Sequence, residues 1–114
     1  MHEFGIADQI LATVLARAGE RRVAAVTVRA GVRHGIVAES MELAFDHAAT
    51  GTPAEGATIA VVPLPAKLRC RHCGAECPTF DVIGVCPQCG DDDVSISGGD
   101  ELTLESIEYA AAPV

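Results

Sequence analysis

The chain has 114 residues, and sixteen Asp and Glu residues against eight Lys and Arg residues give it a formal net charge of −8. This acidic balance argues against nucleic-acid binding, which relies on Lys and Arg to neutralise phosphates. The sequence has no run of about 18 apolar residues that would span a membrane, and its first residues lack the pattern of a signal peptide. We therefore expect a cytoplasmic protein that binds neither nucleic acid nor a membrane.

The first half of the chain predicts two helices and two strands. Residues 4–18 and 38–49 carry apolar side chains at helical spacing. Residues 23–30 alternate in polarity as a strand does, and residues 57–62 form a short apolar run closed by prolines. The expected buried residues of the two helices are Phe4, Ile10, Leu11, Val14, Leu15 and Ala18, then Met41, Ala44, Phe45 and Ala48.

The second half of the chain is organised around cysteines. Residues 68–93 are rich in turns and contain all five cysteines, and strands are expected at 94–97 and 101–109. Because a strand–helix–strand connection favours a parallel pair, we expect an α+β fold. It has a small mixed three-stranded sheet with two helices, plus an inserted four-cysteine zinc-ribbon domain. The expected domains are residues 1–66 with 98–114, and residues 67–97 as the ribbon.

Two CxxC pairs predict a metal site. Cys70 and Cys73 are separated by twelve residues from Cys86 and Cys89, and a glycine follows each pair. Two residues between thiolates allow both sulfurs to face one ion, and glycine permits the tight turn. In a reducing compartment, this spacing is typical of structural tetrahedral zinc. The alternative metal is iron in a rubredoxin-type site, which would make a coloured electron carrier. Cys77 is interpreted as a turn thiol outside the ligand set.

The N-terminus offers a second group of potential ligands. A large side chain at position 2 retains Met1, which leaves a free α-amine beside the His2 imidazole and the backbone nitrogens of His2 and Glu3. Nitrogen ligands suit nickel(II), which favours square-planar or tetragonal geometry. The simpler interpretation is a solvated terminal histidine. We expect His47 and His72 to point to solvent.

Together these features resemble the HypA/HybF family of hydrogenase nickel-incorporation proteins. The resemblance rests on Met1-His2-Glu3 leading into an amphipathic helix, and on the two CxxC pairs inserted late in the chain. It spans essentially the whole chain. Shorter matches are the segments 43–46, 54–56 and 105–108.

The resemblance implies a nickel metallochaperone rather than an enzyme. Such a protein carries Ni(II) as transient cargo and delivers it during maturation of NiFe hydrogenase, and in some organisms the family also serves urease. The implied nickel ligands are His2 and the Met1 amine, with Glu3 as a nearby ligand or a partner contact. Zn(II) would be structural, held by the four CxxC cysteines. The implied partners are a nickel-handling GTPase and the hydrogenase large subunit.

One position departs from the family pattern. Some members place an acidic residue at the start of the second helix, where this chain has Val37. Glu39 is the nearest carboxylate, but it faces a different direction on a helix. The alternative function is a zinc-ribbon protein-interaction adaptor without a nickel role. We identify no paired carboxylates, no nucleophile with a base and no phosphate loop, so no enzyme is expected.

Overall fold

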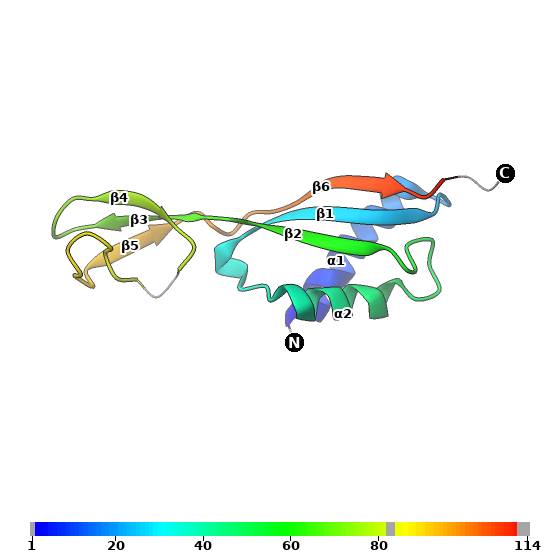
Figure 1. Cartoon of the computed structure of the whole chain (residues 1–114), viewed down its shortest axis with the longest axis horizontal. Helices are drawn as coiled ribbons and strands as arrows, with labels where there is room; N and C mark the ends of the chain where they lie inside the picture. The colour runs from blue at the N-terminus through cyan, green and yellow to red at the C-terminus, as the bar shows by residue number, and fades with distance from the viewer. Residues whose placement is uncertain (1, 82–83, 112–114) are drawn as a thin grey trace. The chain divides into compact units, whose positions relative to one another are not determined.

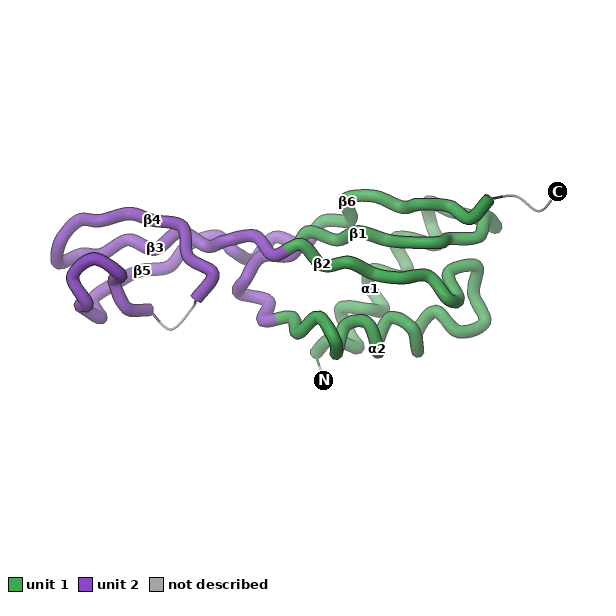
Figure 2. Tube along the Cα trace, viewed as in Figure 1, with its two compact units in different colours: residues 1–29, 36–62, 103–114 green, residues 30–35, 63–102 purple. Residues whose placement is uncertain are grey.

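The computed structural model of the protein describes residues 2–81 and 84–111. These form two compact units (Figure 2), of which unit 1 comprises residues 1–29, 36–62 and 103–114, and unit 2 comprises residues 30–35 and 63–102. Within the described part of the chain, no helix is long and apolar enough to cross a membrane. The elements are α1 (His2–Ala18), β1 (Val23–Gly31), η1 (Val32–His34), α2 (Ala38–Ala49), β2 (Thr58–Leu64), β3 (Ala66–Cys70), β4 (Glu76–Thr79), β5 (Val94–Ser97) and β6 (Leu102–Tyr109).

The larger sheet has the strand order β2-β1-β6. The Val23 N–H donates to the carbonyl of Pro53, shortly before β2, so β1 and β2 begin at the same end and run parallel (Figure 1). At that end the Ala110 N–H donates to the Arg22 carbonyl, which makes β6 antiparallel to β1. The helix α2 supplies the crossover that a parallel pair needs. A mixed three-stranded sheet with two helices confirms the predicted α+β class.

The helices pack together and bury one stripe each. Phe4 was expected on the stripe of α1, but it is 39% exposed and its ring lies edge-on to that of His47, with centroids 6.1 Å apart. The predicted start of the helix at Phe4 was also wrong, because His2 and Glu3 belong to its first turn. A helix turns 100° per residue, so burying Glu3 directs the adjacent Phe4 outward. The buried residues are Glu3, Ala7, Ile10, Leu11, Val14 and Ala18 in α1, and Met41, Ala44, Phe45 and Ala49 in α2.

The sheet of unit 2 has the order β4-β3-β5 and is antiparallel throughout. Leu68 at its centre pairs with Cys77 on β4 and with Ile96 on β5. β5 lies where the sequence predicts it, but β3 and β4 fall in or beside the segment expected to be turns. The alternation along β3 is only five residues long and ends at Cys70, so it is too short to stand out.

Two glycines let backbone segments cross closely in unit 2. A Cβ on Gly31 would lie only 2.1 Å from the carbonyl carbon of Gly99, so no other residue fits at this position without movement of the backbone. Gly99 has φ +75°, and its own Cβ would lie 2.7 Å from that of Ala66. The Gly98–Gly99 turn therefore packs closely against the end of β1 on one side and the start of β3 on the other, and this packing requires glycine at positions 31 and 99.

Candidate metal sites

The four cysteines of the two CxxC pairs lie together in unit 2. Their sulfur atoms are all within 4.8 Å of one another. Cys70 Sγ lies 3.6 Å from Cys89 Sγ, and Cys73 Sγ lies 3.7 Å from Cys86 Sγ. Four sulfurs about 2.3 Å from one tetrahedral zinc ion would be about 3.8 Å apart. The cluster therefore fits a structural zinc ion.

Each CxxC pair is held by the same backbone turn. The Gly74 N–H donates to the Cys70 carbonyl at 3.0 Å, and the Gly90 N–H donates to the Cys86 carbonyl at 2.9 Å. Both glycines have left-handed φ values, +77° and +78°, which other residues rarely adopt. The Cys73 N–H points at Cys70 Sγ, 3.4 Å away. The turns thus direct backbone dipoles at the sulfurs and favour thiolates.

The thiols do not ionise equally. The backbone N–H of Cys89 lowers the pKa of Cys86 to about 7. The N–H of Asp91 favours the Cys89 thiolate, but loss of solvation within the cluster and hydrogen bonds with the three other sulfurs outweigh it and raise the pKa of Cys89 to about 12. Negative charges this close oppose one another. A bound cation would favour four thiolates, and zinc in a closed four-cysteine site would supply that charge.

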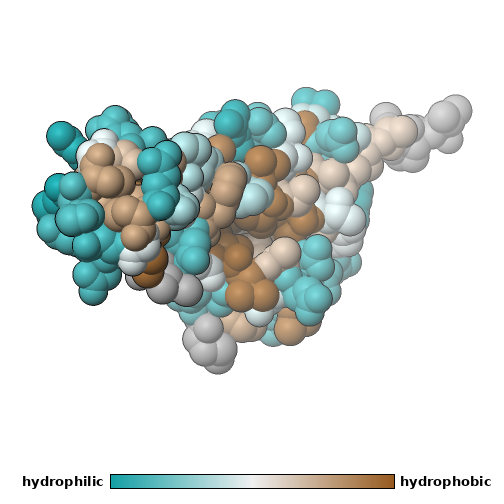
Figure 3. All heavy atoms as spheres, turned by 60° about the vertical axis from the view of Figure 1, so that its left-hand side comes forward, coloured by the Kyte–Doolittle hydropathy of each residue, from teal (hydrophilic) through white to brown (hydrophobic). Residues whose placement is uncertain are grey.

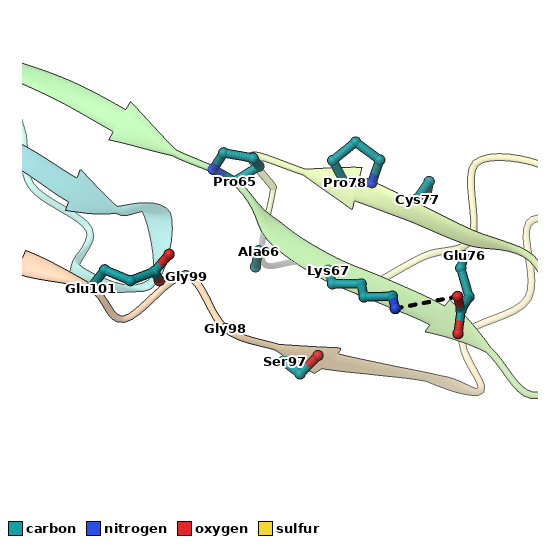
Figure 4. Close-up of a pocket in the computed structure, with 10 residues that line it drawn as sticks. All are labelled: Pro65, Ala66, Lys67, Glu76, Cys77, Pro78, Ser97, Gly98, Gly99 and Glu101. Carbon is teal, nitrogen blue, oxygen red and sulfur yellow. Dashed lines mark ion pairs between the residues drawn. The ribbon is translucent and has the colours of Figure 1, made fainter.

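Cys77 lies outside this cluster, on β4. It lines a cavity of about 630 Å³ between β3, β4 and the Gly98–Gly99 turn (Figure 4). Lys67 Nζ and Glu76 Oε2 form an ion pair 3.3 Å apart at the same cavity. No second cysteine and no histidine lines it among the described residues. The carboxylates that line it belong to Glu76, which is paired with Lys67, and Glu101, so within the described chain the cavity brings no second soft ligand to Cys77.

His2 and Glu3 lie in the first turn of α1 but differ in exposure. The His2 side chain is 54% exposed, and its Nδ1 lies 3.6 Å from Glu3 Oε1. Glu3 is only 6% exposed, and its Oε2 accepts a hydrogen bond of 3.3 Å from the Val37 N–H. The N–H of Glu3 itself and then that of Val37 hold the pKa of the Glu3 carboxyl below its ordinary value. Met1 lies outside the described residues.

Glu3 has a structural task that the sequence did not reveal. Val37 is the N-cap residue of α2 and its apolar side chain caps no N–H group. The Glu3 carboxylate instead accepts a hydrogen bond from the Val37 N–H. It also places negative charge at the positive end of the helix. Helical spacing could have indicated the burial of Glu3, which is in phase with the buried Ala7, Ile10 and Val14, but not its contact with Val37. Glu39, in contrast, is exposed and lines a groove on α2.

Comparison with known proteins assigns the chain to a family. The family model described as hydrogenase/urease nickel incorporation, metallochaperone, hypA matches residues 1–109. The chain belongs to this family. The hydrogenase maturation factor HypA of Rippkaea orientalis is 36% identical over 108 residues and 95% of each chain. That of Geotalea daltonii is 35% identical over 107 residues, 94% of this chain and 97% of the relative.

Solved structures share the fold of this HypA-family chain. The solution structure of the Ni metallochaperone HypA from Helicobacter pylori has a TM-score of 0.61 and is 23% identical, covering 96% of this chain and 98% of that one. A second HypA solution structure has a TM-score of 0.59, with 98% of both chains covered. The resemblance first suggested by Met1-His2-Glu3 and the CxxC pairs is thereby confirmed at the level of family and fold.

The three remaining histidines of this HypA-family chain have other neighbours. His34 Nε2 is 2.8 Å from the Asp100 carbonyl oxygen in unit 2. His47 is exposed on α2, as predicted, and contacts the ring of Phe4. His72 is exposed beside Cys73, and its Nδ1 lies 3.9 Å from Asp91 Oδ2.

Proposed function

We propose that the chain is a nickel metallochaperone that binds Ni(II) at its N-terminus and delivers it during maturation of NiFe hydrogenase. The descriptions of its family and relatives name nickel incorporation and hydrogenase maturation. The observation that carries the proposal for the site is the contrast between His2 and Glu3. An exposed imidazole sits on a helical turn that a buried neighbour anchors. A carrier needs such a site, because its cargo must be reachable by the protein that receives it.

The proposed nickel ligands are the His2 imidazole, the Met1 amine with neighbouring backbone nitrogens, and Glu3. His2 Nδ1 and Glu3 Oε1 are 3.6 Å apart, close enough for one ion to contact both. The Val37 N–H uses the other carboxylate oxygen, so Glu3 is held in place while Oε1 faces His2. Nitrogen and oxygen donors of this kind match the preferences of nickel(II).

The proposed zinc ligands are Cys70, Cys73, Cys86 and Cys89. Zinc bound by four thiolates has no open coordination position, so it would stabilise unit 2 and take no part in cargo exchange. In this proposal residues 67–97 form the zinc-ribbon domain, and residues 1–66 with 98–114 form the nickel domain.

The proposed partners are a nickel-handling GTPase and the hydrogenase large subunit, met in the cytoplasm. The net charge of −8 supports protein partners over nucleic acid, because phosphates would be repelled by most of the surface.

Calorimetric nickel titration tests the proposed site. We expect His2→Ala to weaken nickel binding by at least about 100-fold, since His2 supplies the side-chain nitrogen of residues 1–3. His47→Ala is the matched control, because it removes an exposed imidazole from α2, and it should bind as the unchanged chain does. Residues added before Met1 should also weaken binding, since they convert the amine to an amide. Equal affinity in all four proteins would instead favour the zinc-ribbon adaptor.

A further inference from the structure

The helix α2 and the strand β2 border an open groove of about 580 Å³ in unit 1. Four residues of α2 line it, namely Glu39, Glu42, Leu43 and Asp46. Their spacing of i, i+3, i+4 and i+7 places them on one helix face. The opposite wall consists of residues 56–59, which lead into β2. The groove therefore combines one stripe of α2 with the start of an edge strand.

The dimensions of the two layers explain why the groove is open. Helices are about 10 Å wide, whereas neighbouring strands are only about 4.8 Å apart. Two packed helices are thus wider than a three-stranded sheet. β2 is an edge strand of that sheet within the described chain, and α2 lies along it (Figure 1). A fourth strand added beside β2 would lie over the stripe of α2.

The chemistry of the stripe indicates what such a strand would contain. Leu43 is 68% exposed at its centre, and apolar surface shows on unit 1 between polar side chains in Figure 3. Around Leu43 stand the carboxylates of Glu39, Glu42 and Asp46. Among the described residues, none of the ion pairs involves these three carboxylates. An apolar centre within an acidic rim complements an aliphatic side chain between two cations.

We propose that this groove binds an extended segment of a partner protein as a fourth strand beside β2, with the pattern basic–x–aliphatic–x–basic. Glu39 and Asp46 are about 10 Å apart along the helix axis at 1.5 Å per residue. Three inward-facing residues of a strand span about 13 Å. The aliphatic residue then meets Leu43, and the two basic residues meet Glu39 and Asp46. Main-chain hydrogen bonds to β2 supply affinity, and the alternate side chains supply specificity.

Strand binding in this groove rests on the proposed function in one respect, because it requires a partner protein that receives the cargo. The stripe begins two residues after Val37, whose N–H binds Glu3 beside His2. A strand bound in the groove would thus lie close to the proposed nickel ligands. Nickel itself has no part in the recognition.

Titration of the zinc-loaded full chain with a blocked peptide, GTKTVTKTG, followed by amide chemical shifts, tests the proposal. We expect shifts centred on residues 39–46 and 56–60, with an affinity that falls as salt is added. The peptide GTETVTETG, in which both lysines become glutamates, should bind at least tenfold more weakly. Equal binding of the two peptides, absence of binding at millimolar concentration, or shifts centred elsewhere would each overturn the proposal.

Charge reversal on the chain provides the second arm. Glu39→Lys combined with Asp46→Lys should weaken binding of the lysine peptide at least tenfold, because these two carboxylates meet its lysines. Glu20→Lys combined with Glu108→Lys changes the net charge equally on other exposed surfaces and should change affinity less than twofold. An equal loss of peptide affinity in both double variants would show that only overall charge matters, and it would contradict binding in the groove. His2→Ala should bind the peptide normally, so failure of the nickel site and failure of the groove are distinguishable.

Discussion

Glu3 is a buried charge whose contacts explain its position. Its carboxylate lies beside the exposed His2 imidazole on one side and accepts a hydrogen bond from Val37, the N-cap residue of α2, on the other. Burying a charge is costly unless hydrogen bonds to it compensate. Here the N–H groups of Glu3 and Val37 stabilise the ionised form. One residue thus couples the position of the terminus to the start of the second helix.

Replacing Glu3 by Gln should lower stability and change its dependence on acid. The pKa of Glu3 is lowered on folding, so its contribution is present above the ordinary pKa, about 4.3, and is lost as pH falls through the lower folded value. The Gln variant should lack that component. Thermal unfolding monitored by helical circular dichroism reports on unit 1, which contains both α1 and α2. Glu20→Gln, at an exposed turn, is the control, and identical pH profiles for all three proteins would disprove the role.

We expect two cysteine-to-serine variants to differ in their zinc content. The unchanged chain should carry about one zinc ion per molecule and be colourless. Cys70→Ser should lose most of the zinc, because it removes a buried sulfur of the cluster, whereas Cys77→Ser should keep it. Metal content of the purified proteins provides the measurement. A red, iron-loaded protein, or zinc lost only from the Cys77 variant, would contradict the ligand assignment.

At the scale of elements, glycine positions distinguish crowded backbone from open helix. Gly31 ends β1 where the Gly99 backbone leaves no room for a Cβ, while a Cβ on Gly5 in α1 would meet nothing within 4 Å. Gly31→Ala should therefore destabilise the protein by more than about 1 kcal/mol, since backbone must move. Gly5→Ala should stabilise it by about 0.5–1 kcal/mol through helix propensity. Denaturant unfolding of both variants checks the opposite signs, and a stable Gly31→Ala protein would refute the close crossing.

Sequence patterns located the elements that carry a long period. The strand at residues 23–30 and the helix at residues 38–49 were predicted almost to the residue. In the strand the alternation of polarity, and in the helix the helical spacing of apolar residues, continues for most of the element. The strands β3 and β4 were missed because four or five residues give too short a pattern. At the sites, fixed ligand spacing revealed the cysteine cluster, whereas Glu3 bonds to a residue 34 positions away. Such a contact depends on how α1 and α2 pack, which local sequence does not encode.

At the scale of the whole molecule, charge is unevenly distributed. The acidic stripe of α2 contrasts with β3 and its following turn, where Lys67, Arg69 and Arg71 alternate along the chain. Lys67 and Arg69 share the carboxylate of Glu76, and Arg71 pairs with Asp93 at 2.9 Å. Both units are nonetheless acidic, since unit 1 has nine Asp and Glu against four basic residues and unit 2 has seven against four. Exposed ion pairs of this kind contribute little to stability. The proposed zinc site would therefore stabilise unit 2 together with the small apolar face of β3.

Removal of zinc should consequently affect the two units differently. A chelator should abolish the dispersed amide signals of β3, β4 and β5, because few buried apolar residues remain to hold that sheet without metal. The helical circular dichroism should persist, since both helices lie in unit 1, which has its own core. Simultaneous loss of both signals would show instead that the chain unfolds as one cooperative body.

The place of β6 in the larger sheet has a consequence for synthesis. β1 is the central strand, but one of its edges is paired only by β6, which emerges from the ribosome after residues 65–101. Until then the nascent chain displays an open strand edge, the kind of surface that promotes aggregation. Zinc capture by the proposed cysteine ligands would shorten the loop that must close before β6 can pair, which lowers the entropic cost of closing it. Zinc should thus accelerate the recovery of β1–β6 amide protection during refolding, and cells starved of zinc should accumulate this protein as insoluble, newly made chains.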